Sequence, residues 1–329
     1  MLGVAKLAPG PGNVALVERP EPVARPGHVV LDVVAAGICG TDLHIVDDEF
    51  PSRPPVTLGH EVAGVVATLG DGVDEAWHGA RVVTETYFST CGTCASCRAG
   101  RRNLCPERRS IGSAVDGGFA PRVEVPSVNL HRIPDWLDGL AAPMLEPLAC
   151  CCNSLPEGLV GDGDEVLVVG PGPVGLLAAQ LAAAAGGRVH LRGTPRDAVR
   201  LAVASSLGYE ASTTEDDPPG EHDVVVECSG HEVGIGFALA SARRGGRYVQ
   251  IGLAGKPVSL PIDTVCLKEL TVTSGNASTT ASWRRAVELV SSRAVALEPL
   301  LSGALPLERW EKAFADTRSG LGVKHVLVP

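Results

Sequence analysis

Four cysteines within fifteen residues constrain this chain more than any other feature of its sequence. They form the pattern Cys-x2-Cys-x2-Cys-x7-Cys at Cys91, Cys94, Cys97 and Cys105. Thiolates this close together in a glycine- and arginine-rich loop can converge on one tetrahedral Zn²⁺. A closed site of four thiolates has no open coordination position, so the pattern predicts a structural metal that holds a folded lobe together. Two disulfides or free surface thiols are the alternative.

The composition describes a folded, acidic chain. Hydrophobic residues make up 45% of the 329 positions, charged residues 20%, and the formal net charge is −10 at pH 7. A negative chain is repelled by phosphate-rich surfaces, which disfavours nucleic-acid and membrane partners. Residues 1–6 lack the charged and then apolar order of a secretion signal, and the apolar run 176–185 is too short to span a bilayer. We therefore expect a cytoplasmic protein whose ten cysteines stay reduced.

The hydrophobic pattern changes near residue 164 and predicts two different architectures. Before it, short apolar runs such as 28–34 and 61–67 are bounded by glycine and proline, as in a β-rich domain. After it, strand patterns alternate with helical stretches, which favours an α/β fold with a doubly wound parallel sheet. The expected strands are 164–169, 188–191, 223–226, 247–251 and 270–273, and the expected helices are 176–185, 196–207, 233–242, 283–292 and 307–317.

A glycine-rich turn follows the first strand of the second region. Gly170, Gly172 and Gly175 form a G-x-G-x-x-G pattern that also contains Pro173 and Val174 and leads into the next expected helix. In this strand–turn–helix context the glycines let the backbone approach a pyrophosphate, and the helix N-terminus stabilises its charge. We therefore expect a dinucleotide to bind here. A glycine turn that only packs the helix on the strand is the alternative.

The end of the second expected strand bears on which dinucleotide is bound. A carboxylate usually stands there to accept hydrogen bonds from the adenosine ribose, whereas this chain has Arg192, Gly193 and Thr194, with Arg196 close behind. Glycine leaves space, threonine donates a hydrogen bond and arginine adds positive charge, which together favour a 2′-phosphate and hence NADP over NAD. In the alternative, Asp197 accepts the hydrogen bonds from the ribose, and the arginines are solvated charges on the following helix.

A second group of potential metal ligands is spread over three segments. Residues 39–44 read Cys-Gly-Thr-Asp-Leu-His, residues 59–61 read Gly-His-Glu, and residues 146–148 read Glu-Pro-Leu. Three mixed ligands with an exchangeable fourth position are typical of catalytic zinc. Each segment alone is ambiguous, because a single cysteine or histidine is more often simply packed. All three precede the glycine turn, and together they predict a catalytic metal site.

These motifs make the chain resemble the zinc-dependent medium-chain dehydrogenases, in particular the sorbitol and threonine dehydrogenase branch. The resemblance covers nearly the whole length. It implies a GroES-like catalytic domain at 1–150 with the four-cysteine lobe at 91–105, a Rossmann NAD(P)-binding domain at 151–275, and a return to the catalytic domain at 276–329. It also implies two Zn²⁺ ions per subunit and a small-molecule alcohol bound in the cleft between the domains.

The resemblance also assigns roles to individual residues. It implies that the zinc ligands are Cys39, His60 and Glu146, and that Glu61 is a carboxylate able to approach the metal. It also implies that Asp42 orients His60 and that Thr41 and His44 form a proton relay. Two departures from the family are the missing ribose carboxylate and three consecutive cysteines at 150–152. A thiolate takes the third ligand position in other branches, but Glu-Pro-Leu is this branch's own pattern and favours Glu146.

The implied activity is hydride transfer between a secondary alcohol and the nicotinamide of NAD(P). The ligands do not distinguish a sugar alcohol, a cyclitol or an amino alcohol, although the branch favours polyols. A zinc-free quinone or enone reductase of the same fold is one alternative, and it would lack the Cys39–His60–Glu146 set. A non-catalytic zinc and nucleotide-binding protein is another. The family forms homodimers and homotetramers through the nucleotide domain, for which we expect an edge strand at 256–261.

Overall fold

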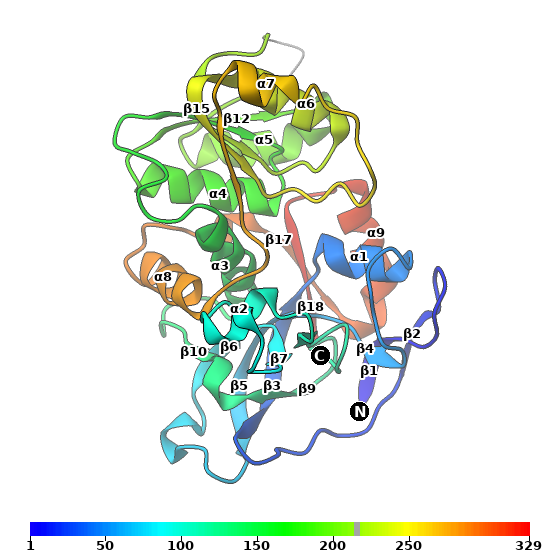
Figure 1. Cartoon of the computed structure of the whole chain (residues 1–329). Helices are drawn as coiled ribbons and strands as arrows, with labels where there is room; N and C mark the ends of the chain where they lie inside the picture. The colour runs from blue at the N-terminus through cyan, green and yellow to red at the C-terminus, as the bar shows by residue number, and fades with distance from the viewer. Residues whose placement is uncertain (214–217) are drawn as a thin grey trace. The chain divides into compact units, whose positions relative to one another are not determined.

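Two units make up the chain in the computed structural model, which describes residues 1–213 and 218–329 (Figure 1). The first unit contains residues 1–146, 279–287 and 301–329, and the second contains residues 147–278 and 288–300. The boundaries near 150/151 and 275/276 that the resemblance implies lie at 146/147 and 278/279, and residues 288–300 belong to the second unit instead of the return to the first. Each unit has a hydrophobic core of its own.

The first unit is built mainly from antiparallel strands. One sheet has the order β10–β6–β5–β3–β18–β17, with β9 also paired to β3, and a smaller sheet has the order β2–β1–β4. Its core includes Leu31, Val62 and Phe119, all removed from water. The elements are β1 Leu2–Lys6, β2 Val14–Glu18, β3 His28–Gly37, α1 Gly40–Val46, β4 Val56–Thr57, β5 Glu61–Leu69, β6 Arg81–Thr84, β7 Tyr87–Ser89, α2 Ala95–Arg98, β8 Arg109–Ser110, β9 Arg122–Pro126, β10 Leu130–Arg132, β17 Leu301–Pro306, α9 Trp310–Ser319 and β18 Lys324–Val328.

Strand register brings distant residues of this unit to one place. β3 and β5 run antiparallel with Gly37 opposite Glu61. Cys39, two residues beyond the end of β3, therefore lies near His60, which immediately precedes β5. β18 is antiparallel to the same end of β3, and its register places Lys324 level with Cys39. Two segments from the first fifth of the chain and one from its end thus meet at one edge of the sheet.

Six parallel strands form the sheet of the second unit, in the order β13–β12–β11–β14–β15–β16. Counted from β11, this is the 3-2-1-4-5-6 order of a doubly wound dinucleotide-binding sheet. Right-handed crossovers in opposite directions from β11 and β14 place α4 and α5 on one face and α6 and α7 on the other. The elements are α3 Leu145–Ser154, β11 Glu165–Val169, α4 Pro173–Ala184, β12 Arg188–Gly193, α5 Ala198–Ser206, β13 Glu210–Thr213, β14 His222–Glu227, α6 Glu232–Ser241, β15 Ala242–Gln250, α7 Asp263–Leu267, β16 Thr271–Ser274 and α8 Thr280–Ser291, the first and last of which cross the unit boundaries.

The expected elements are present with ends shifted by a few residues, apart from two differences. The expected edge strand at 256–261 is wrong: this segment has no regular structure, because Pro257 and Pro261 remove backbone donors, and the two edges of the sheet are β13 and β16. The sequence analysis missed β13, whose Glu-Ala-Ser-Thr sequence carries almost no hydrophobic signal. Within residues 1–213 and 218–329, the helices are all too short or too polar to cross a membrane.

Candidate active site and metal centres

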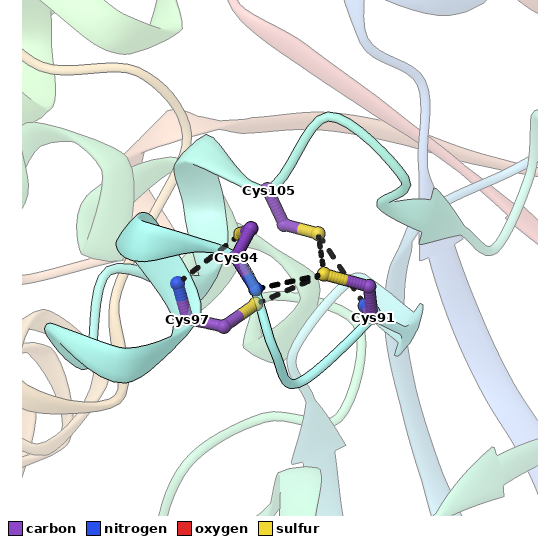
Figure 2. A group of neighbouring side chains, drawn as sticks. All are labelled: Cys91, Cys94, Cys97 and Cys105. Atoms are coloured by element: carbon purple, nitrogen blue, oxygen red, sulfur yellow. Dashed lines mark hydrogen bonds between the residues drawn. The ribbon is translucent and has the colours of Figure 1, made fainter.

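The four thiols of the lobe point toward one another (Figure 2). The ligand atoms of Cys91, Cys94, Cys97 and Cys105 all lie within 4.8 Å of one another. Cys91 Sγ is 3.6 Å from Cys105 Sγ and 4.0 Å from Cys97 Sγ. A tetrahedron of thiolates about 2.3 Å from Zn²⁺ has edges of about 3.8 Å, so these donors fit this metal. All ten cysteines are free thiols in the structure, so no disulfide joins the four cysteines of the lobe.

Backbone N–H groups prepare the lobe to hold a cation. The N–H groups of Cys94, Cys97 and Cys91 donate to the sulfur atoms of Cys91, Cys94 and Cys105, respectively, each at 3.4 Å. The N–H groups of Cys94 and Thr93 lower the pKa of Cys91 to about 6. Because the thiolate is the species that ligates zinc, at least one lobe sulfur is ready to bind at neutral pH.

Cys39, His60 and Glu61 form the other group of metal-ligating side chains among the described residues. One potential ligand atom from each lies within 4.8 Å of the other two. Cys39 caps the N-terminus of α1, and Glu61 begins β5, so the register of β3 and β5 fixes their separation. Glu61 is fully buried. Sulfur, nitrogen and oxygen donors in one partly buried group fit the mixed ligand set of a catalytic zinc site.

Asp42 contacts two members of this group, Cys39 and His60. Its Oδ2 accepts a hydrogen bond from the backbone N–H of Cys39 at 2.8 Å, and its Oδ1 lies 3.4 Å from Nδ1 of His60. Burial lowers the pKa of His60, but the charges of Asp42 and Cys39 and their hydrogen bonds outweigh it, so the pKa is raised well above its usual value. With Nδ1 turned to Asp42, Nε2 is the nitrogen left for a metal.

A buried ion pair fixes Glu61 and was missed by the sequence analysis. Lys324 Nζ lies 2.6 Å from Oε1 and 2.5 Å from Oε2 of Glu61, and it also donates to the carbonyl of Ile38 at 2.9 Å. Burial lowers the pKa of Lys324, but Glu61 and Cys39 outweigh it, so the pKa is raised. A Cβ at Gly37 would lie 2.0 Å from Oε2 of Glu61, so only glycine there leaves room for the carboxylate.

Glu146 and the cysteine triplet share helix α3. Glu146 lies in the first turn and is 6% exposed, outside the three residues whose ligand atoms meet within 4.8 Å. Cys151 is fully buried and donates to the carbonyl of Val174 at 3.5 Å. The middle thiol of the triplet therefore packs against the start of α4 and is not part of the metal group.

Thr41 and His44 stand on α1, where their neighbours hold them differently. Thr41 Oγ1 lies 3.7 Å from Cys39 Sγ. His44 Nδ1 lies 2.7 Å from Oε2 of Glu49, and the backbone N–H of Glu49 donates to the His44 carbonyl at 2.8 Å. The sequence analysis missed Glu49, whose only signal is a carboxylate five residues after the histidine. A contact at Nδ1 leaves Nε2 of His44 for proton exchange.

Each of the three glycines in the dinucleotide motif is explained by a different structural requirement. Gly170 has a φ of +96°, and a Cβ there would lie 2.7 Å from the backbone nitrogen of Ser229. Gly172 caps α4 and has no atom within 4 Å of its Cβ position, which leaves space above the helix N-terminus. A Cβ at Gly175 would lie 1.9 Å from the carbonyl oxygen of Gly170, so glycine permits close packing of helix on strand. This geometry fits a pyrophosphate cradle.

The end of β12 combines charges of both signs. Both the backbone N–H and the hydroxyl of Thr194 donate to Oδ2 of Asp197, at 2.9 and 2.8 Å. Arg200 lies 3.6 Å from the same carboxylate, and Arg196 is exposed. A Cβ at Gly193 would lie 2.9 Å from Cγ of Pro171 and 3.0 Å from Cβ of Asp197. Packing against these two residues therefore explains the glycine, and the expectation that it leaves open space is corrected.

Arg192, the remaining residue expected to face the cofactor, is buried within the second unit. It is 5% exposed, and its guanidinium lies 5.6 Å from the centre of the Phe237 ring. A buried guanidinium over an aromatic face adds positive potential behind the end of β12 without being placed at the surface.

Comparisons with known proteins agree with both the metal-ligating residues of the first unit and the dinucleotide motif of the second. Residues 25–135 match the model of the alcohol dehydrogenase GroES-like domain, and residues 173–292 match that of the zinc-binding dehydrogenase domain. The sorbitol dehydrogenase of Halalkalibacterium halodurans is 36% identical over 341 residues, covering 100% of this chain and 99% of the relative. The L-threonine 3-dehydrogenase of Bacillus velezensis is 34% identical, covering 96% of each chain.

The comparison with solved structures also finds dehydrogenases. A zinc-binding dehydrogenase from Sinorhizobium meliloti bound to NADP superposes with a TM-score of 0.90 at 33% identity, covering 100% of this chain and 99% of that one. Galactitol-1-phosphate dehydrogenase from Escherichia coli superposes with a TM-score of 0.89 at 25% identity, covering 100% of both chains.

Proposed function

We propose, because this chain belongs to the zinc-dependent medium-chain dehydrogenases, that it transfers hydride between the CH–OH group of a secondary alcohol and NAD(P). The observation that carries the proposal is the grouping of Cys39, His60 and Glu61 in a chain that also has a complete dinucleotide motif. A zinc-free reductase of the same fold needs the glycine motif but has no need of this group. A non-catalytic protein has no need of the proton-exchanging residues Thr41 and His44.

Two zinc ions per subunit are proposed, one in the lobe and one beside α1. Cys39 and His60 hold the second, with Glu146 as the third ligand. The close pairing of Glu61 with Lys324 neutralises that carboxylate, which supports a role beside the metal for Glu61. The ligand role of Glu146 rests on its Glu-Pro-Leu sequence, since its carboxylate lies outside the group within 4.8 Å. A bound zinc supplies Lewis acidity that favours loss of the alcohol proton. Asp42 keeps Nε2 of His60 directed at the metal position.

The chain's own residues then handle the proton. Thr41 accepts the alcohol proton at Oγ1 and passes on its own, a role supported by its position 3.7 Å from Cys39 Sγ. His44 receives a proton at Nε2 and releases it to solvent, since its ring is about two-fifths exposed. Glu49 holds Nδ1 and so keeps the ring in the tautomer that accepts at Nε2.

A sugar alcohol or its phosphate is the proposed substrate class, with a threonine-like amino alcohol second. Full-length relatives include the sorbitol and threonine dehydrogenases described above and the D-arabitol-phosphate dehydrogenase of Enterococcus avium, at 32% identity. Ten free thiols support a reducing compartment such as the cytoplasm. The edge strand β16, with Val272 48% exposed, supports assembly into a homodimer or homotetramer.

NADP is the proposed cofactor. Near the end of β12, Arg196 is exposed, Arg200 lies beside the Asp197 carboxylate and Arg192 is buried, so three arginines against one carboxylate leave a net positive charge that supports a 2′-phosphate. We expect kcat/KM for NADP to exceed that for NAD by about tenfold, equal to 1.4 kcal/mol. Arg196→Ala should remove most of this preference. Asp197→Asn should weaken NAD binding if Asp197 holds the ribose, and should strengthen NADP binding if it does not.

The test of the proposal is a matrix of alcohols against both cofactors. Sorbitol, arabitol, galactitol, their phosphates and L-threonine are each offered with NAD and with NADP, and reduced nicotinamide is followed by absorbance at full zinc loading. We expect turnover with a polyol or polyol phosphate. Turnover of quinones or enones in zinc-free protein, without turnover of any alcohol, would contradict the proposal.

A further inference from the structure

Glu227 ends β14 with a carboxylate that is fully buried and surrounded by donors. Its Oε1 accepts from the backbone N–H of Ser229 at 2.8 Å and from the Ser229 hydroxyl. Its Oε2 accepts from the backbone N–H of Gly230 at 3.1 Å and from the side-chain amide of Gln250 at 2.7 Å. All of these partners donate, which is the pattern that an ionised, acceptor-only carboxylate satisfies.

The same carboxylate joins the loops that follow two neighbouring strands. Ser229 and Gly230 follow β14, whereas Gln250 ends β15 and donates to the carbonyl of Gly252 at 2.7 Å. The hydroxyl of Tyr248 donates to the Gln250 side-chain oxygen at 2.5 Å, which fixes the amide so that its nitrogen faces Glu227. A Cβ at Gly252 would lie 2.3 Å from the nitrogen of Gly230, so the two loops are in close contact.

One of these loops supports the dinucleotide motif directly. A Cβ on Gly170 would lie 2.7 Å from the nitrogen and 2.8 Å from Cα of Ser229, so the first glycine of the motif rests on the residue that Glu227 holds. The backbone N–H of Cys228 donates to the carbonyl of Val169, just before the motif, at 2.8 Å. A shift of Ser229 would therefore be felt at the glycine turn.

Sheet topology tells which half of a dinucleotide this network faces. In the 3-2-1-4-5-6 order, the ends of the first three strands receive the adenosine half, and the ends of the fourth and fifth receive the other half. Glu227 and Gln250 end the fourth and fifth strands, β14 and β15. We infer that Glu227 is a positioning residue that shapes the nicotinamide half of the site by holding both loops in place. This inference rests on the proposed dinucleotide-dependent function.

An isosteric amide separates this role from simple filling of space. Glu227→Gln keeps the volume but leaves one acceptor oxygen, and its NH₂ group then faces donors from Gly230 or Gln250. Buried donors without acceptors are unfavourable, so the loops should rearrange. Glu232→Gln, five residues further on the exposed first turn of α6, makes the same chemical change without touching the network and is the matched control.

The experiment measures binding by calorimetry for NADP, NAD and the fragment adenosine 2′,5′-bisphosphate, with thermal unfolding of each variant alongside. We expect Glu227→Gln to raise Kd for both dinucleotides at least about tenfold and to change Kd for the fragment less than about twofold, whereas Glu232→Gln changes neither. Unchanged dinucleotide binding, or equal losses for dinucleotide and fragment, would overturn the inference.

A second variant covers the case in which Glu227→Gln does not fold. Ser229→Ala removes one donor and one packing contact, and we expect it to raise Kd for the dinucleotides about threefold with fragment binding unchanged. No selective loss in that variant would overturn the inference as well. If wild-type protein binds neither dinucleotide, the proposed function fails first, so the two failures are distinguishable.

Discussion

The two candidate metal centres of the first unit are assembled in opposite ways. The lobe takes four identical donors from residues 91–105, whereas the centre beside α1 gathers three different side chains, Cys39, His60 and Glu61, at the facing ends of β3 and β5, and its third proposed ligand, Glu146, comes from α3. In the lobe, backbone N–H groups of the same loop bond to the sulfurs. In the other centre, His60 and Glu61 are each held by a separate charged residue, Asp42 and Lys324.

This difference distinguishes a structural metal, which stabilises the fold around it, from a site whose geometry is set by the surrounding fold. The four thiols of the lobe come from one short loop, so the binding energy of a metal there is local folding energy. The side chains beside α1 are held by sheet register and by buried charged partners. A site held by its surroundings can keep one coordination position for substrate, as a catalytic site requires.

The largest expected effect is on turnover in His60→Ala. Loss of the imidazole removes a ligand from the site beside α1, and we expect kcat/KM to fall by at least about 10³-fold, or roughly 4 kcal/mol of transition-state stabilisation. Dinucleotide Kd should change little, because the glycine motif belongs to the other unit. His78→Ala, at an exposed position of the same unit, is the control. Full turnover by zinc-depleted His60→Ala would assign the chain to the zinc-free reductases.

The next effect concerns the buried ion pair. Lys324→Met leaves the Glu61 carboxylate buried without its cation, and we expect the free energy of unfolding of the first unit to fall by about 3–5 kcal/mol. Lys324→Arg keeps the charge and should lose much less. Denaturant unfolding followed by tryptophan fluorescence measures both, since Trp77, Trp136, Trp283 and Trp310 all lie in the first unit. Equal stability of the Met variant and wild type would show that the pair does not hold Glu61.

The smallest effect tests the residue beside the relay. Glu49→Gln keeps a hydrogen-bond acceptor for His44 but removes the charge, and both side chains are partly exposed. We expect kcat to fall about threefold, with KM for the alcohol unchanged and the difference shrinking at high salt. Asp48→Asn removes a neighbouring charge without touching His44 and is the control. A kcat for Glu49→Gln equal to that of Asp48→Asn would show that Glu49 does not orient the ring.

The comparison of the two centres also explains what the sequence could predict. The lobe and the glycine motif are local, so spacing alone indicated where Cys91, Cys105 and Gly170 would lie. The pairing of Lys324 with Glu61 spans 263 positions and depends on the register of β18 against β3, which no local pattern encodes. The role of Glu227 could not be predicted from the sequence either, because it depends on hydrogen-bond donors from two separate loops.

The errors have local physical causes of their own. Gly193 suggested space for a phosphate, but the approach of Pro171 accounts for the absence of a side chain. The expected strand at 256–261 had alternating apolar residues, and its two prolines prevent pairing in the sheet. Composition indicates how a segment prefers to fold, whereas contacts between segments decide what a given position is for.

The most direct test of this account compares Cys39→Ser with Cys97→Ser in zinc content and turnover. Each change removes one thiolate, and we expect each to reduce about two zinc ions per subunit to about one. Cys97→Ser should retain measurable turnover while the lobe at 91–105 becomes sensitive to protease. Cys39→Ser should keep a protease-resistant lobe and lose turnover. Loss of turnover in Cys97→Ser together with full turnover in Cys39→Ser would contradict the assignment of the two centres.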